Sequence, residues 1–244
     1  MTDITIEPAS SSIPSPLRKP RRIGARMSEI ILGGQDGLVN VLGIILGLAA
    51  ATNDTRIVII GGLAATFAES ISMAAVAYTS TLADLDFYRA EVERERREIK
   101  EVPHLERQEI REIFAGWGFE NDLLDRIVDH IADHEDHWVE IMMAHELNLQ
   151  PIDPNGLLVT AALVGFSAIV GSLIPLLPFF FLPSKLAMVC GVLLAAVTLF
   201  GVGVVKARMT IGRPARSGLQ MMLIGILSAL AGYGVGVLLG TPGA

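Results

Sequence analysis

Five apolar runs, each long enough to cross a lipid bilayer, constrain the fold of this 244-residue chain more than any other feature. A helix rises about 1.5 Å per residue, so about 20 apolar residues span the roughly 30 Å of hydrocarbon. The runs lie at about 31–52, 57–80, 157–182, 186–205 and 217–240. The sequence therefore predicts an all-α integral membrane protein with five transmembrane helices.

Basic residues set the predicted orientation. They precede the first run (Arg18, Lys19, Arg21, Arg22 and Arg26) and fill the connection between the fourth and fifth runs (Lys206, Arg208, Arg213 and Arg216). The other two short connections hold only Arg56 and Lys185. Because short cytoplasmic loops are enriched in Lys and Arg, we expect the N-terminus and residues 81–156 in the cytoplasm and the C-terminus outside.

The sequence divides into four segments. Residues 1–27 are expected to form a disordered cytoplasmic tail, because they hold several Ser and Pro and lack the basic-then-apolar order of a signal peptide. Residues 28–81 hold transmembrane helices 1 and 2, residues 82–150 form a cytoplasmic helical insert, and residues 151–244 hold transmembrane helices 3–5. A short chain without targeting features is typical of a prokaryotic plasma membrane.

The insert is strongly acidic. Residues 81–150 contain 19 of the 26 Asp and Glu, 8 of the 19 Lys and Arg and all five His, a formal net charge of −11, while the rest of the chain carries +4. Such a field attracts cations and repels nucleic acid, so metal ions and not nucleic acids are the expected partners. The apolar pattern predicts three helices, at 82–101, 104–115 and 120–148, with Pro103 ending the first.

Carboxylates and thioethers recur in the insert at spacings that place them on shared helix faces. They are Glu91, Glu95 and Glu98 on the first helix, Glu106 and Glu109 on the second, and Met142, Met143 and Glu146 on the third. Hard oxygen ligands combined with soft sulfur ligands fit a borderline divalent ion such as Fe²⁺, Mn²⁺ or Zn²⁺ better than Mg²⁺.

Plainer interpretations of the same residues stay open. Glutamates mixed with Arg94, Arg96 and Arg97 are typical of a solvated helix with i, i+4 ion pairs, and methionines commonly fill a core. The third helix also carries His130, His134 and His137 at i, i+4 and i+7. This spacing suits metal-binding imidazoles, but it lacks the signature of a zinc protease and is equally typical of a surface.

Two acidic side chains fall inside the apolar runs. A carboxylate in hydrocarbon costs roughly 2.5–3.5 kcal/mol on insertion scales, so Glu69 indicates a function or a neutral carboxyl that binds a neighbouring helix. Met73 lies one helical turn after Glu69, and Asp36 and Asn40 repeat this spacing in the preceding run. Desolvation favours a proton on a carboxyl and a cation displaces it, so one site can exchange protons for metal.

Several motifs together resemble the vacuolar iron transporter family. They are Asp36-Gly37-Leu38-Val39-Asn40, Ser72-Met73-Ala74, the Glu-rich helix, Met142-Met143-Ala144-His145-Glu146-Leu147, Ile174-Pro175-Leu176-Leu177-Pro178 and Arg216-Ser217-Gly218. The resemblance runs in order from about residue 20 to the C-terminus. It implies a homodimer in the lipid bilayer that exchanges cytoplasmic Fe²⁺ for protons, with no cofactor besides the transported metal.

The resemblance also implies roles for individual residues. Asp36 and Met73 correspond to pore positions. The corresponding metal ligands of the insert are Glu95, Glu98, Glu106, Glu109, Met142, Met143 and Glu146. This chain has Ala77 where many members have an acid shortly after the Ser-Met-Ala motif. Proton coupling therefore falls to Glu69 or follows a different path.

The combined hypothesis is a proton-coupled antiporter, not an enzyme, that moves Fe²⁺ and other divalent transition metals out of the cytosol. Its transport pathway comprises Asp36, Asn40, Glu69 and Met73. Two alternatives belong to other classes: a membrane-anchored di-iron oxidase or ferroxidase, and a metal-responsive binding protein. The oxidase would be expected to carry paired Glu-x-x-His motifs, which this sequence lacks.

Overall fold

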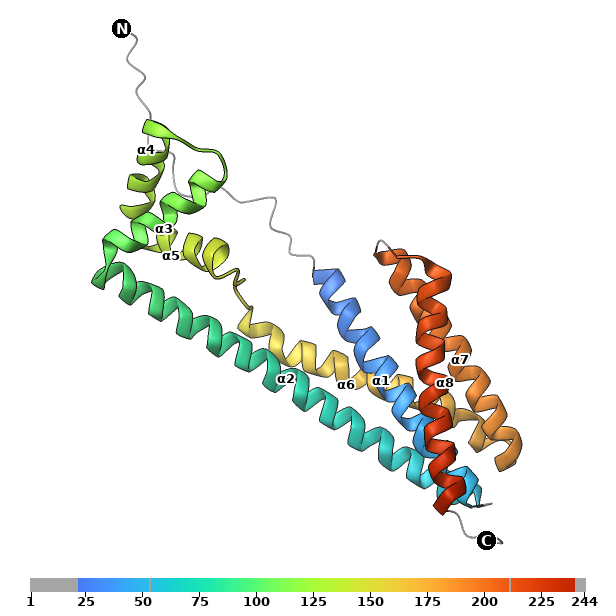
Figure 1. Cartoon of the computed structure of the whole chain (residues 1–244). Coiled ribbons are helices and arrows are strands. Elements are labelled where there is room, and N and C mark those ends of the chain that lie inside the picture. The colour runs from blue at the N-terminus through green and yellow to red at the C-terminus, as the bar shows by residue number, and fades with distance from the viewer. Residues whose placement is uncertain (1–21, 53, 211, 240–244) are drawn as a thin grey trace.

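The computed structural model describes residues 22–52, 54–210 and 212–239, and within these ranges it contains helices and no strand (Figure 1). The long helices are α1 (Arg22–Ala51), α2 (Thr55–Glu101), α6 (Leu157–Leu176), α7 (Ser184–Met209) and α8 (Pro214–Leu239). All five are long and apolar enough to cross a membrane. The predicted all-α membrane fold is confirmed. The predicted tail lies outside the described residues up to residue 21, and α1 begins at Arg22.

Helix α2 extends well beyond the membrane. Its 47 residues correspond to about 70 Å, more than twice the thickness of the hydrocarbon, and only its first half is apolar. The Asp54 side chain caps the start by accepting a hydrogen bond from the backbone N–H of Arg56 (2.8 Å). The end at Glu101 matches the prediction, because Pro103 lacks an N–H and begins the next helix.

Helix α1 lies at the centre of the membrane bundle and contacts α2, α6, α7 and α8. Small residues allow these close approaches. A Cβ on Gly37 would clash with the carbonyl oxygen of Ala168 in α6, and Gly43 and Gly47 lie against Gly232 and Gly236 in α8. Where helices have no hydrophobic drive to associate, close backbone contact of this kind supplies the packing energy.

The insert folds around its own apolar core at the far end of α2 (Figure 1). Its elements are α3 (Pro103–Gly116), α4 (Asn121–Ala132), α5 (Glu135–Ile141) and the one-turn π-helix η1 (Met142–Glu146). Two short 3₁₀ turns, η2 (Pro154–Gly156) and η3 (Leu177–Phe180), flank α6. Leu124, Val128 and Ile131 from α4 meet Trp138 and Val139 from α5 in this core.

The prediction of one continuous helix over 120–148 is wrong. The chain leaves the helix at Asp133 and restarts after His134, whose backbone is extended (φ −130°, ψ 90°). Residues 132–137 offer almost no apolar surface to hold a helix against the core. The break also places Glu135 and Asp136 in the first turn of α5, where the helix dipole favours them and Arg96 of α2 pairs with both (2.9 and 2.7 Å).

Candidate functional site

A cluster of glutamates forms where α2, α3 and η1 pack together. Its members are Glu95 and Glu98 from α2, Glu106 and Glu109 from α3, and Glu146 from η1. Glu95 and Glu106 are almost fully buried (3% and 5% exposed). One oxygen of each, Oε2, is buried with no hydrogen-bond partner among the described residues. Buried carboxylates normally have donors, so these two oxygens call for a proton or a cation.

The glutamates shift one another's protonation. Burial, then the charges of Glu146 and Glu106, raise the pKa of Glu95 to about 7. Burial, then the charges of Glu109 and Glu98, raise the pKa of Glu106 to about 7 as well. The pKa of Glu146 is also raised, by burial and by its charge contact and hydrogen bond with Glu109. The cluster therefore holds protons near neutral pH, and a cation can take their place.

The outer side of the same α2 face fits the plainer interpretation of solvated ion pairs. Arg94 pairs with Glu98 (3.0 Å) and Glu91 (3.6 Å) at i, i+4 and i, i+3 spacing. Glu95 has no such partner and points into the insert. The structure therefore divides the Glu-rich face into an exposed, arginine-paired side and a buried side.

Met142 and Met143 are both buried, 0% and 2% exposed, and belong to the apolar core of the insert. They lie in the π-helix that also carries Glu146. A π-helix is an uncommon local distortion that often accompanies a functional site. This placement fits core packing directly, and it also brings two thioethers to the elements that hold the glutamates.

The cluster is open rather than a finished metal cage. Within residues 22–52, 54–210 and 212–239, no three His, Cys, Asp or Glu side chains converge closely enough to hold one ion. The histidine series lies at the α4–α5 break, where the rings of His130, His134 and His137 follow one another at 4.9 and 5.3 Å. The His134 ring Nδ1 also hydrogen bonds to the His130 carbonyl oxygen (2.9 Å).

A second polar group lies between α1 and α2 inside the membrane bundle. The Asn40 side-chain amide donates a hydrogen bond to Glu69 Oε1 (3.0 Å), and the Asp36 carboxyl lies within reach of the Glu69 carboxyl. A hydrogen bond between two carboxyl groups would require one proton between them. Met73 lies one turn beyond Glu69 and is partly buried. Three of the four predicted pathway residues thus meet across two helices.

Glu29 was not among the predicted site residues. The Thr160 hydroxyl donates to Glu29 Oε1 (3.2 Å), and Oε2 is buried without a partner among the described residues. Glu29 lies seven residues before Asp36, on the same face of α1. The i, i+7 spacing is visible in the sequence, but Glu29 precedes the apolar run at 31–52, so the hydropathy pattern alone does not place it in the membrane helix.

These features define an all-α integral membrane protein with one carboxyl site among its membrane helices and another in an acidic helical insert. The model of the VIT family matches residues 27–237, and the chain belongs to this family. It is 34% identical to vacuolar iron transporter 2 of rice (Oryza sativa subsp. japonica) over 213 residues, which cover 87% of each chain.

Other relatives also match most of this chain. Vacuolar iron transporter 1 of Arabidopsis thaliana is 31% identical over 235 residues, 96% of this chain and 94% of the relative. Protein CCC1 of Saccharomyces cerevisiae is 26% identical over 216 residues, 85% of this chain and 67% of the relative. The likeness therefore includes the insert as well as the membrane helices.

Proposed function

We propose that this chain moves Fe²⁺, together with other divalent transition metals such as Mn²⁺ and Zn²⁺, out of the cytosol in exchange for protons. The names of the related proteins support iron as cargo. The observation that carries the proposal is the pair of buried, unpartnered oxygens of Glu95 and Glu106 within a cluster of five glutamates. Such a group attracts a divalent cation and releases protons when it binds one.

The insert captures the metal ion. Five carboxylates from three elements give oxygen ligands, and their open arrangement allows the ion to leave again. Met142 and Met143, next to them in sequence on η1, add soft sulfur that favours Fe²⁺ over Mg²⁺. Because the insert concentrates cations on its own side of the membrane, and the positive-inside pattern predicts that side to be cytoplasmic, transport runs outward.

The membrane group passes the ion on. Glu69 and Glu95 lie on one continuous helix, 26 residues or about 40 Å apart. Asp36, Asn40 and Glu69 supply oxygen ligands at membrane depth, with Met73 one turn away. The proton held between Asp36 and Glu69 is released when a cation binds, and a proton from the other side restores the bond. This cycle is an antiport.

The protein acts as a homodimer in a plasma membrane, with the N-terminus in the cytoplasm and the C-terminus outside. The family resemblance supports the dimer, and the distribution of Lys and Arg supports the orientation. Cysteine accessibility tests the orientation: in a Cys190→Ser background, the Glu112→Cys variant should react with membrane-impermeant reagents only from the cytoplasmic side.

Proteoliposomes with an imposed proton gradient test the function. Purified protein should move Fe²⁺ across the liposome membrane and move protons in the opposite direction. Asp36→Asn and Glu69→Gln, which keep side-chain size, should each lower both fluxes at least about tenfold. Glu93→Gln, an exposed neighbour on α2, should leave them unchanged. Metal binding without flux would support a binding protein instead, and oxygen consumption on adding Fe²⁺ would support an oxidase.

A further inference from the structure

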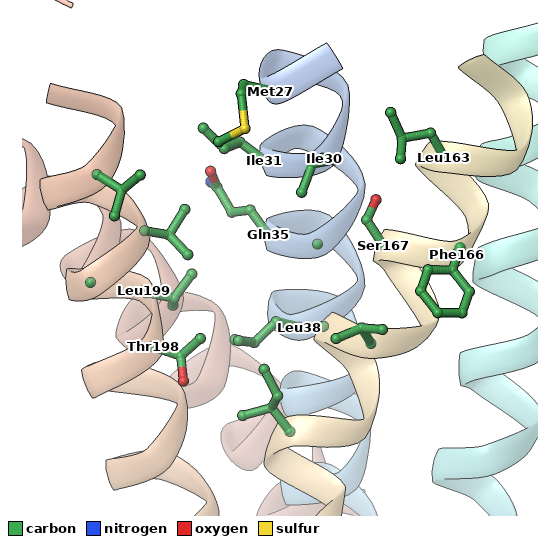
Figure 2. A pocket seen from close by; sticks show the side chains of 17 residues that line it. Met27, Ile30, Ile31, Gln35, Leu38, Leu163, Phe166, Ser167, Thr198 and Leu199 are labelled. Atoms are coloured by element: carbon green, nitrogen blue, oxygen red, sulfur yellow. The ribbon is translucent and has the colours of Figure 1, made fainter. Parts of the chain in front are cut away.

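A deep apolar cavity opens between α1, α6 and α7 within the membrane bundle (Figure 2). Its volume is 620 Å³, within the range of sites that hold organic ligands. Apolar side chains line it, among them Leu38, Phe166, Val170, Leu199 and Val202. This site is separate from the carboxyl group between α1 and α2.

The few polar side chains in the cavity are already bonded or lie at its end. Ser167 donates to the carbonyl oxygen of Val164, and Thr198 donates to that of Leu194 (both 2.8 Å). Neither hydroxyl needs water in the cavity. An apolar cavity of this kind does not hold water, and in a membrane the surrounding medium that can fill it is lipid hydrocarbon.

The cavity continues into a smaller, more polar one at the C-terminal end of α7. The second cavity, of 310 Å³, shares Met27, Ile31 and Gln35 with the first and is also lined by Lys206 and Thr210. In Figure 2 the Gln35 side chain points into the space between α1 and α7. Lys206 is exposed and makes no ion pair with the residues that the structure describes.

More positive charge lies near this end. Arg208 is two residues beyond Lys206, and Arg213 and Arg216 lie at the connection to α8; all three are exposed. The two cavities thus form one groove, apolar at membrane depth and basic where the helices reach the headgroup layer. Basic pockets between transmembrane helices commonly bind anionic lipid headgroups.

We infer that the groove binds an anionic phospholipid, with its phosphate at Lys206 and one acyl chain between α1, α6 and α7. The charge of the mouth selects the headgroup, and the apolar walls accept the chain. A second copy of the protein fits less well, because a twofold axis through the groove would bring two basic connections together. The site depends on the membrane architecture alone and is independent of the transported ion.

Native mass spectrometry of protein released from bilayers of equal phosphatidylglycerol and phosphatidylcholine tests the headgroup. The protein should retain phosphatidylglycerol in clear excess. Lys206→Gln should lower that retention about fivefold, because one basic residue near the surface contributes about 1 kcal/mol. Lys185→Gln is the matched control, since Lys185 is also exposed but lies at the opposite end of α7, and it should retain the lipid normally.

A second pair of variants tests the acyl chain site. Gly201 lines the cavity, and a Cβ there meets no atom within 4 Å, so Gly201→Leu fills the groove without disturbing the helices. It should lower lipid retention several-fold. Gly234→Leu makes the same change in open space on α8 and should have no effect. Equal retention of both lipids by the parent protein, or normal retention by Gly201→Leu, would overturn the inference.

If a second copy of the protein occupied the groove in place of a lipid, cross-linking would show it. In a Cys190→Ser background, a cysteine replacing Val205, which lines the groove, should not form a disulfide between two copies in the bilayer. Efficient cross-linking at this position would make the groove a subunit interface and overturn the lipid assignment.

Discussion

This protein has two clusters of carboxyl side chains, one in the insert and one among the membrane helices, and they differ in how their buried carboxyls are hydrogen-bonded. In the insert, Glu95 and Glu106 are buried beside three other glutamates, and one oxygen of each has no donor among the described residues. In the membrane, Glu69 has an amide donor and a carboxyl partner. In the insert group, Arg94 pairs with Glu98 at the outer side, but these two buried oxygens lack a donor within the described ranges, whereas in the membrane group Glu69 has one.

Under the proposed function, this difference fits two separate roles. Buried acids without donors would take up protons or cations readily, which suits the capture of metal from solution. A carboxyl pair bonded to an amide is closed until an ion displaces its proton, which suits controlled passage. The comparison predicts that substitutions in the membrane group change transport and those in the insert change binding and its pH dependence.

The largest effect is expected from Glu69→Gln. It removes the carboxyl that joins α1 to α2 while keeping a group that can still bond Asn40. Metal transport in proteoliposomes should fall at least about tenfold, or about 1.4 kcal/mol in the barrier, while metal binding to the insert stays normal. Thr79→Val, at an exposed hydroxyl later on α2, is the control. Transport at the parent rate by the Gln variant would remove Glu69 from the pathway.

A second effect is expected from pH on metal binding to the insert. Because the pKa values of Glu95 and Glu106 are about 7, binding below pH 7 must displace protons. Affinity measured by calorimetry should weaken about tenfold per pH unit for each proton displaced. The double variant Glu95→Gln/Glu106→Gln should bind weakly and lose this dependence. A parent affinity that is constant from pH 6 to pH 8 would contradict the raised pKa values.

The same residues should limit the stability of the metal-free insert. The folded pKa of Glu95 lies above the usual value of 4.5, so the folded state binds more protons and stability falls as pH rises from about 4.5 through 7. Glu95→Gln should therefore stabilise the insert at pH 8, by about 1 kcal/mol. Both tryptophans, Trp117 and Trp138, lie in the insert, so their fluorescence reports its unfolding. Destabilisation at pH 8 would show that the carboxylate is compensated.

Much of this arrangement was predictable from the sequence. The length of the apolar runs determined the five membrane helices, and Pro103 determined the end of α2. The i, i+3 and i, i+4 spacings placed the acids of each helix on a common face. Spacing within one helix cannot say which faces of different helices meet, and the family resemblance provided that connection for the insert.

Other features depended on contacts between distant segments. The break after Ala132 places Glu135 and Asp136 beside Arg96, almost 40 residues earlier, which pairs with both. The role of Glu29 depends on Thr160 in another helix. The groove at Lys206 is lined by residues of α1 and α7, which lie far apart in the sequence. Local pattern contains none of this information.

The smallest expected effect comes from Arg96→Gln. This variant tests whether the stability of the insert can change without a change in its metal affinity. Arg96 is partly exposed and pairs with two acids that are also accessible to solvent, so its loss should destabilise the insert by less than about 1 kcal/mol. The α4–α5 break should loosen, and tryptophan fluorescence should show a slightly lower unfolding midpoint. Metal affinity and its pH dependence should remain normal, because Arg96 contributes to none of the pKa shifts of the glutamate cluster. A change in affinity comparable to that of Glu95→Gln would mean that the break positions the cluster, and capture would then depend on the whole insert.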